Sequence, residues 1–236
     1  MPKQFTASTL YFLQEGHDNL RECLGASFQA AIQQNITKLV IFTARGEGVR
    51  LALEQFSTLP EYSHIKIIAV TFPAGMVFTD KDKKSIDVRI SDEDIAFFHA
   101  KGVPIVRAHL PFDPIAPFYK GRGELGQDLG TVAQVLNMFC GSMSLCVQAI
   151  AMACDAGHVG LAEHVIALTS DTSILAQATC THRMIGEMVI REILCKPVVM
   201  SVLRREVAEK LPTQLQLSAP ETDKPAELPA PDDSSK

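Results

Sequence analysis

The segment 42–50, FTARGEGVR, holds residues whose types and spacing could bind an anion. Glycines let the main chain approach a bound group, and the helix predicted to follow would present free N–H groups and a partial positive charge. Arg45 could donate two hydrogen bonds to a phosphate, whereas Glu47 would repel it. Because the full P-loop or dinucleotide pattern is missing, a plain turn with a solvated Arg–Glu pair is the alternative. The candidate phosphate-binding residues are Thr43, Ala44, Arg45, Gly46, Glu47 and Gly48.

Two further polar features follow apolar runs. His109 ends a predicted strand, where its imidazole could contact a ligand or act as acid or base, although a lone histidine there can also be structural. The run TSDTS follows another predicted strand, and its hydroxyl and N–H groups suit a phosphate or a sugar. A polar loop that caps itself is the alternative. The candidate residues of this run are Thr169, Ser170, Asp171, Thr172 and Ser173.

Other reactive residue types form no recognisable site. The six cysteines include no C-x-x-C pair, and on a helix only Cys140 and Cys154 would share a face, at least two turns apart, so we expect no metal site. No HExxH motif and no Ser–His–Asp pattern can be read, so the sequence names no reaction. We expect the cysteines to be reduced and the protein to be cytoplasmic, because the start MPKQFTASTLYF lacks the pattern of a signal peptide.

Composition limits the partners. The chain has 236 residues, of which 47% are hydrophobic, so it can bury a sizeable core. Its net charge of −5 argues against a general nucleic-acid binder. The uncharged stretch 138–154 resembles a membrane span but is too short and too rich in small and polar residues, so a buried central helix is expected instead.

The elements that must position these residues alternate between helices and short apolar strands. Asn19 and Glu22 have the spacing of a capping box, which predicts a helix over 19–34 that ends at a left-handed Asn35. The continuously apolar runs are typical of strands buried on both faces of a parallel sheet. Expected strands cover 38–43, 65–72, 103–109 (at an edge) and 164–169, and expected helices cover 47–57, 91–101, 131–156 and 201–210.

This alternation predicts a three-layer α/β/α sandwich with a mostly parallel sheet of about five strands. The last strand, 187–195, carries Arg191 and Glu192 and is expected to run antiparallel at an edge. We expect one domain over 1–210 and a disordered, proline-rich acidic tail over 211–236. Long loops are predicted at 73–90 and 110–130.

Ligands of such sheets gather beyond the carboxyl ends of the strands. Three segments should therefore meet there, namely 43–48, 109–130 and 169–180.

From about residue 9 to 200, the chain resembles small stand-alone proteins built on the pyruvate kinase C-terminal α/β domain. REILCKP (191–197) is similar to the family's R-E-I-I-C-K-P, and MFCGSMSLCVQAIAMACDAGHV (138–159) is similar to its F-G-Q-G…M-A-A-D-A-G helix. FTARGEG (42–48) falls on its T-G-E-T loop, and RAHL (107–110) on its T-H-A-L. TLYFLQEGHDN (9–19) looks like its opening strand and turn.

The resemblance implies this fold and a phosphate site at 43–48. Members of the family have been seen with flavin mononucleotide (FMN), which is therefore the nucleotide cofactor we expect. The chain departs from the family where TSDTSILAQAT (169–179) replaces a glycine-rich loop, and where Ser144 and Gln148 replace a lysine and a glutamate. No counterpart of the catalytic barrel of pyruvate kinase is found, so no pyruvate kinase activity is expected.

Three functional hypotheses remain open at this point. The first is a protein that binds a phosphorylated small molecule through the candidate residues above. The second is an enzyme that uses His109 as acid or base at the same site. The third is an assembly role, in which the long helix or the strand 187–195 packs between subunits of a homo-oligomer.

Overall fold

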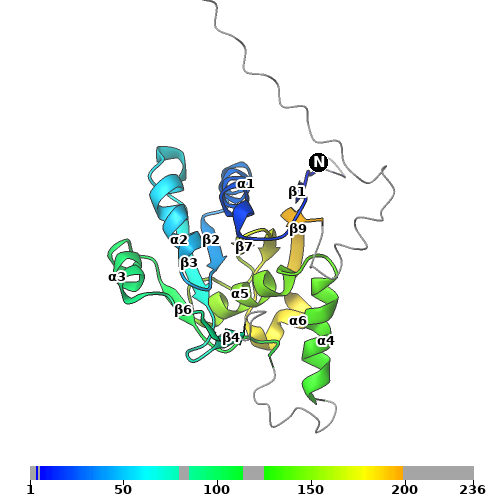
Figure 1. The fold of residues 1–236 in the computed structure, drawn as a ribbon. Helices are drawn as coiled ribbons and strands as arrows, with labels where there is room; N and C mark the ends of the chain where they lie inside the picture. The colour runs from blue at the N-terminus through cyan, green and yellow to red at the C-terminus, as the bar shows by residue number, and fades with distance from the viewer. Residues whose placement is uncertain (1–3, 5, 80–84, 114–124, 199–236) are drawn as a thin grey trace, which may run out of the picture. The chain divides into compact units, whose positions relative to one another are not determined.

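A computed structural model describes residues 4, 6–79, 85–113 and 125–198, which all belong to one compact unit within residues 1–201. Among these residues, seven strands form one sheet in the order β1-β9-β8-β7-β2-β3-β6 (Figure 1). The predicted number of about five was too low, because the short strand β1 and the strand β8 were not counted. β8 is antiparallel to both neighbours, and every other neighbouring pair is parallel, so the predicted α/β class is confirmed. The strands are β1 (Leu10–Phe12), β2 (Lys38–Phe42), β3 (Lys66–Thr71), β6 (Ile105–Arg107), β7 (His164–Leu168), β8 (Ser173–Gln177) and β9 (Val189–Pro197).

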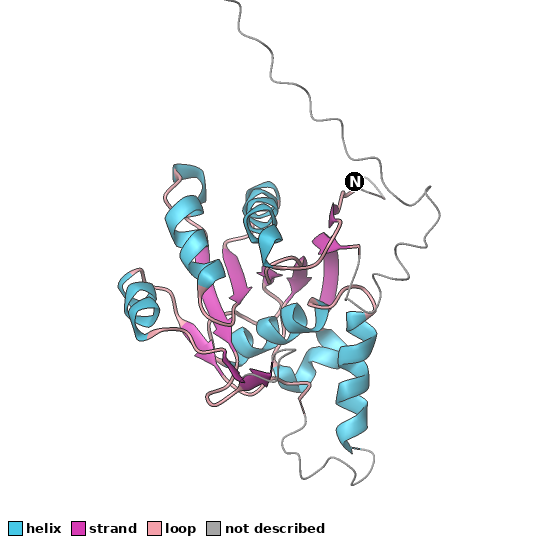
Figure 2. Ribbon diagram, viewed as in Figure 1, coloured by secondary structure: helices cyan, strands magenta, loops and turns pink. Residues whose placement is uncertain are grey.

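Helices lie on both faces of the sheet (Figure 2). α1 (Leu20–Gln33), α2 (Glu47–Leu51) and α3 (Asp92–Ala100) contribute to one hydrophobic core. α4 (Leu125–Asn137), α5 (Met143–Asp155) and α6 (Met184–Glu187) contribute to the other. Short helical turns occupy His17–Asn19, Pro60–Tyr62 and Thr181–Arg183, and α2 continues as a π-helical turn, Ala52–Phe56.

β2 shows how the apolar runs produce this architecture. Successive side chains of a strand point to opposite faces, and β2 lies between β7 and β3. Leu39 and Ile41 therefore enter the core that contains α1, whereas Val40 and Phe42 enter the core that contains α5.

The edges of the sheet differ in part from the prediction. β6 lies at one edge, as Pro104 and Arg107 indicate. β9, predicted to run antiparallel at an edge, lies inside the sheet between β8 and the short strand β1, so its edge placement was wrong. Its predicted direction was wrong as well: β8 is antiparallel to both β7 and β9, so β9 runs in the same direction as β7, and β8 is the antiparallel strand. Because β1 pairs only with Cys195–Pro197, the rest of β9 keeps the polar, exposed pattern of an edge strand.

The helix predicted over 131–156 is two helices. α4 ends at Asn137 and α5 begins at Met143, and the Asn137 side-chain oxygen accepts a hydrogen bond from the Ser144 N–H, 3.3 Å away. The predicted buried central helix is α5, of whose 13 residues ten are buried. α4 begins at Leu125, so the predicted loop 110–130 is shorter than expected; residues 114–124 lie outside the described part.

Of the two predictions made for the ends of α1, the left-handed terminator is confirmed and the capping box is wrong. Asn35 has a φ angle of 54°, the expected left-handed terminator. The capping box was wrong, because the Asn19 side-chain nitrogen donates to the Gln14 carbonyl instead and makes no capping bond to the helix. The turn His17–Asn19 already leads the chain helically into α1, which leaves Asn19 without the extended conformation of an N-cap.

The predicted loop 73–90 contains a small antiparallel hairpin of β4 (Val77–Thr79) and β5 (Ser85–Asp87). The predicted helix 201–210 and tail 211–236 lie outside the described residues. Within the described ranges, no helix has the length and apolarity needed to span a bilayer.

Candidate functional site

A cavity of about 350 Å³ opens at the carboxyl ends of β2, β3 and β7. The turn after β2 forms one wall, and the turn after β7 forms another. Its polar lining comes from His17, Thr43, Arg45, Glu47, Ser142, Thr169 and Ser170. Its apolar and small lining comes from Leu20, Phe42, Ala44, Gly48, Phe72, Ile86, Val88 and Leu145.

The turn after β2 is held by the fold itself. The Thr43 N–H donates to the Val70 carbonyl of β3, and the Thr43 hydroxyl oxygen accepts from the Gly46 N–H, 2.9 Å away. Gly46 has a φ of 100°, which L-residues rarely adopt. A side chain there would lie 3.1 Å from the ring of Phe98, on α3. Gly46 thus faces the core, and among the predicted phosphate-binding residues it is the one that does not line the cavity.

Gly48 has a different role in the same turn. It is buried, and a Cβ atom there would come within 3.2 Å of Ile41 and 3.5 Å of Leu20. The missing side chain lets the start of α2 approach β2 and α1 closely. The two glycines are therefore explained by backbone conformation and packing, and their presence is compatible with a ligand without requiring one.

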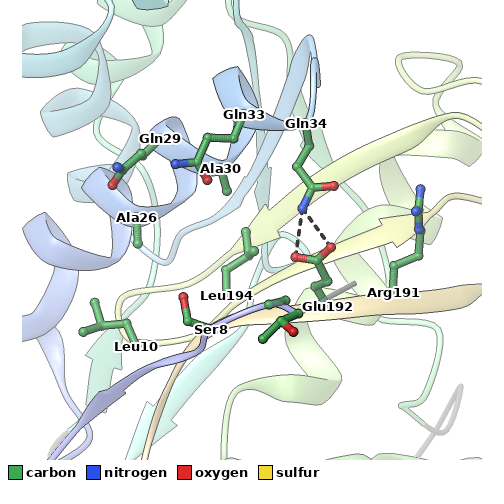
Figure 3. Close-up of a pocket in the computed structure, with 12 residues that line it drawn as sticks. Ser8, Leu10, Ala26, Gln29, Ala30, Gln33, Gln34, Arg191, Glu192 and Leu194 are labelled. Atoms are coloured by element: carbon green, nitrogen blue, oxygen red, sulfur yellow. Dashed lines mark hydrogen bonds between the residues drawn. The ribbon is translucent and has the colours of Figure 1, made fainter. Parts of the chain in front are cut away.

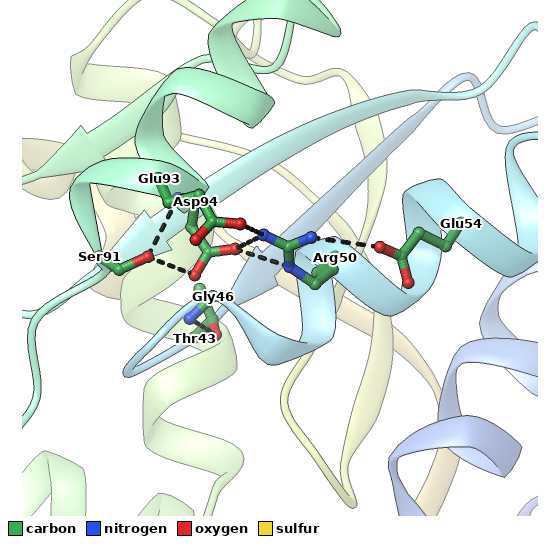
Figure 4. Close-up of polar contacts among 7 residues, drawn as sticks. All are labelled: Thr43, Gly46, Arg50, Glu54, Ser91, Glu93 and Asp94. Carbon is green, nitrogen blue, oxygen red and sulfur yellow. Dashed lines mark hydrogen bonds and ion pairs between the residues drawn. The ribbon is translucent and has the colours of Figure 1, made fainter.

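Arg50 connects α2 to α3 beside this turn (Figure 4). Its Nε and Nη2 atoms lie 2.7 and 2.5 Å from Asp94 Oδ1, and its guanidinium stacks 4.9 Å from the ring centre of Phe97. Hydrogen bonding to Asp94 raises the pKa of Arg50. Asp94 is itself fixed by Ser91, the predicted N-terminal residue of α3, whose hydroxyl caps the helix. This network supports the turn from outside the cavity.

The second group of candidates, Thr169 to Ser173, lies in the turn after β7 and at the start of β8, and only part of it lines the cavity. Thr169 and Ser170 line the cavity, but Asp171, Thr172 and Ser173 are buried behind it. Asp171 accepts hydrogen bonds from the Gly16 N–H at 2.9 Å and from the Thr172 hydroxyl at 3.0 Å.

The remaining contacts of this turn are also internal. The Ser27 hydroxyl donates to the Ser173 hydroxyl at 2.7 Å, and the Thr172 hydroxyl lies 3.4 Å from Cys140 Sγ. These contacts match the self-capping alternative for Asp171, Thr172 and Ser173. The group of five ligand-binding candidates is thus reduced to the two that line the cavity.

His109 does not line the cavity. It is exposed, and its Nε2 atom donates to the Asp113 carbonyl oxygen, 2.9 Å away. Of the three segments predicted to meet, the first and third do so, and the described residues of the second do not. Gln148 anchors that second segment, because its side-chain oxygen accepts from the Phe112 N–H at 2.8 Å.

Several lining residues were not predicted from the sequence. His17 reaches the cavity from the turn before α1, Ser142 and Leu145 come from the start of α5, and Ile86 and Val88 lie at and after β5. The break between α4 and α5 and the hairpin inside a presumed loop place these residues. His17 lies in the segment 9–19, for which the sequence predicted no site residue.

The cysteines offer no reactive group to the cavity. All six are free, and Cys23, Cys140, Cys146 and Cys195 are buried. Burial raises the pKa of Cys23 and of Cys146 well above the usual thiol value, so these thiols stay protonated. Among the described residues, no group of three or more His, Cys, Asp or Glu could hold a metal ion.

A larger cavity of about 660 Å³ lies between α1, β9 and the segment before β1 (Figure 3). The side-chain amide nitrogen of Gln34, the residue after α1, lies 2.8 Å from both carboxylate oxygens of Glu192 on β9. The predicted site residues lie elsewhere, so this cavity is separate from the one described above.

Comparison with known proteins adds no assignment to this geometry: no protein-family model matches the chain, and no curated protein is significantly similar to it.

Proposed function

We propose that the chain binds a phosphorylated small molecule in the cavity at the carboxyl ends of β2, β3 and β7. The observation that carries this proposal is that one cavity is lined both by the Thr43–Gly48 turn and by Thr169 and Ser170. The side chains and N–H groups of both segments suit a phosphate, and the two segments are more than 120 residues apart in the sequence.

The polar wall would hold the phosphate. Thr43, Thr169 and Ser170 offer hydroxyl groups, and Arg45 offers a guanidinium group. Glu47 lies in the same wall, where a carboxylate can accept a hydrogen bond from a ligand hydroxyl. A ligand that carries a hydroxyl near its phosphate could contact both Arg45 and Glu47 in this wall.

The apolar wall would hold the rest of the ligand. Phe42 and Phe72 pack edge to face with ring centres 4.8 Å apart, and Val88 and Leu145 extend this surface. A flat apolar group joined to a phosphate fits such a lining, and the volume falls at the small end of the range for ligand sites, about 300–1,000 Å³. FMN combines a ring system, hydroxyls and a phosphate, and it is the compound to test first. When bound, it would supply redox chemistry of its flavin ring.

We also infer the finer fold assignment, a three-layer sandwich of the pyruvate kinase C-terminal kind. Two cores on opposite faces of the sheet support the three-layer arrangement. The two alternatives have less support. An enzyme that uses His109 would need that side chain in the cavity, and assembly through α5 would need a helix that is not already buried in the chain.

Thermal unfolding of the full chain with a panel of phosphorylated compounds, FMN included, tests the proposal. A ligand at 100-fold excess over its Kd should stabilise the protein by about 2.7 kcal/mol. Flavin absorbance of the purified protein would identify FMN directly. If every compound of the panel leaves the unfolding temperature unchanged, the proposal is refuted.

A pair of variants tests the location. Ser170→Glu places a carboxylate in the cavity, and its repulsion of a phosphate should weaken binding at least tenfold, about 1.4 kcal/mol. The matched control is Gln33→Glu, which adds the same charge at the far end of α1, roughly 20 Å from Leu20 in the cavity wall. Equal affinities of the two variants would place the ligand elsewhere.

A further inference from the structure

A third cavity, of about 550 Å³, lies at the opposite end of the strands, where β2 and β3 begin. Its wall includes Lys38 and Lys66, the first residues of these strands, and Lys101 at the end of α3. His158, after α5, lines it too. Four elements that are distant in the sequence thus bring three lysines and a histidine to one cavity, and the Lys101 ammonium lies over the Phe97 ring of α3, 6.0 Å from its centre.

The charge of this cavity is only partly balanced. Lys38 forms an ion pair with Glu163, at 2.8 Å between Nζ and Oε2. Burial alone would raise the pKa of Glu163, but hydrogen bonds from Lys38 and Gly160, together with the positive charge of Lys66, lower it. Lys38 and Lys66 therefore share one carboxylate, that of Glu163, and the three lysines leave the cavity with a net positive charge.

A buried hydroxyl group lines the same cavity. The Ser57 Oγ atom is shielded from solvent and has no hydrogen-bond partner among the described residues. Buried polar atoms are normally paired, because an unmade hydrogen bond costs free energy. Ser57 lines the cavity, so rotation about its χ1 bond would bring the hydroxyl proton to an oxygen atom there. The hydroxyl of Ser63, another lining residue, already donates to the Pro60 carbonyl. An oxyanion would satisfy the Ser57 hydroxyl and the lysines together.

Stabilisation of helix ends by the lysines would be the simpler explanation, since cations favour helix C-termini. The ends of α3 and α5 are, however, already satisfied by the main chain. At α3, the carbonyls of Phe97, Phe98 and His99 accept hydrogen bonds from the N–H groups of residues 101–103. At α5, the carbonyls of Met152, Ala153 and Cys154 accept from those of residues 156–159. Capping therefore does not account for the convergence of charge.

We propose that this cavity binds a small anion with two or more phosphate or carboxylate groups, held by Lys66, Lys101 and the Ser57 hydroxyl. The site is distinct from the cavity at the carboxyl ends of the strands and does not depend on the function proposed for it. Its ligand is a compact polyanion without the flat apolar group that the other cavity suits.

Calorimetric titration of the full chain with inorganic pyrophosphate tests this site. The unaltered protein should bind pyrophosphate, and Lys66→Gln/Lys101→Gln should bind it at least tenfold more weakly. The control Arg21→Gln/Arg107→Gln removes the same charge from exposed residues outside both cavities and should bind like the unaltered protein. Absence of binding, or equal weakening in both double variants, would overturn the proposal.

Two further variants separate the sites and guard against misfolding. Ser57→Ala removes the unpaired hydroxyl, so its unfolding temperature without anion should be equal to or above that of the unaltered protein, while pyrophosphate binding weakens. Ser170→Glu, which alters the other proposed phosphate site, should leave in place the pyrophosphate binding that depends on Lys66 and Lys101. If Ser170→Glu abolishes it and the lysine variant does not, the anion binds in the other cavity, and the inference made here is wrong.

Discussion

Gly46 combines a φ angle of 100° with a direct approach to Phe98 and Ile90. This contact changes how the effect of a substitution in the turn 43–48 must be interpreted. A side chain at Gly46 would enter the core between α2 and α3 and would not enter the cavity. Loss of ligand binding in a Gly46 variant would thus report on folding, which is why Ser170 is the better probe of the site.

We expect Gly46→Ala to destabilise the fold by roughly 1–3 kcal/mol, because it adds backbone strain and a 3.1 Å contact with Phe98. Gly75→Ala is the matched control, since Gly75 has a φ of 80° with no atom within 4 Å of an added Cβ, so it adds the strain alone. Chemical denaturation of both variants measures the difference. If Gly46→Ala costs no more than Gly75→Ala, the packing role assigned to Gly46 is incorrect.

Asp171 joins two secondary-structure elements, the turn before α1 and the β7–β8 hairpin. Its carboxylate is buried and accepts from the Gly16 N–H and from the Thr172 hydroxyl. These two segments hold His17 and Ser170 in the cavity wall. A residue first considered as a ligand contact thus positions two other lining residues.

Asp171→Ala should destabilise the protein by about 1.5–3 kcal/mol, because it leaves buried donors without their acceptor. Asp171→Asn should retain most of the stability, since its amide oxygen can still accept from Gly16 while its NH₂ group donates to a hydroxyl. Asp18→Ala, at an exposed position of the same turn, serves as the control and should change little. Thermal unfolding checks all three, and an Asn variant as unstable as the Ala variant would contradict this account.

The sequence predicts these elements well where apolar runs are continuous. β2, β3 and β7 are buried on both faces, so their apolar patterns are strong, and the turn 43–48 follows directly from the end of β2. β8 was missed because SILAQ follows β7 after a very short turn and was included in the polar loop. This tight hairpin buries Asp171–Ser173 and leaves only Thr169 and Ser170 at the cavity.

The errors at the site arise from tertiary arrangement, which local sequence patterns do not reveal. The break between α4 and α5 depends on the tertiary position of Asn137, whose side chain caps the second helix, and no periodicity in the sequence marks it. That break places Ser142 and Leu145 at the cavity. His109 was predicted there because it follows a strand, but β6 lies at the sheet edge, beyond β3, and its end is far enough along the sheet to miss the cavity.

The sheet of the described unit has a hydrophobic core on each face, and the strands contribute side chains to both cores. Alternate residues of β2 and β3 enter opposite cores, as Ile41 does in the core with α1 and Ile68 in the core with α5. Because each strand supports both cores, loss of either core removes the surface against which the other packs. The described unit should therefore unfold in a single cooperative transition, and both candidate cavities should be lost together in it.

Ile41→Ala and Ile68→Ala should each lower the free energy of unfolding by about 2–5 kcal/mol, because both side chains are at most 2% exposed. Each variant should lower the hydrogen-exchange protection of α1 and of α5 together, whichever core it alters. Ile185→Ala is the control, since Ile185 is 68% exposed and its loss should change stability by less than about 0.5 kcal/mol. If Ile41→Ala lowers the protection of α1 alone and leaves α5 unaffected, the two cores fold independently. The cavities at the two ends of the strands could then be lost separately.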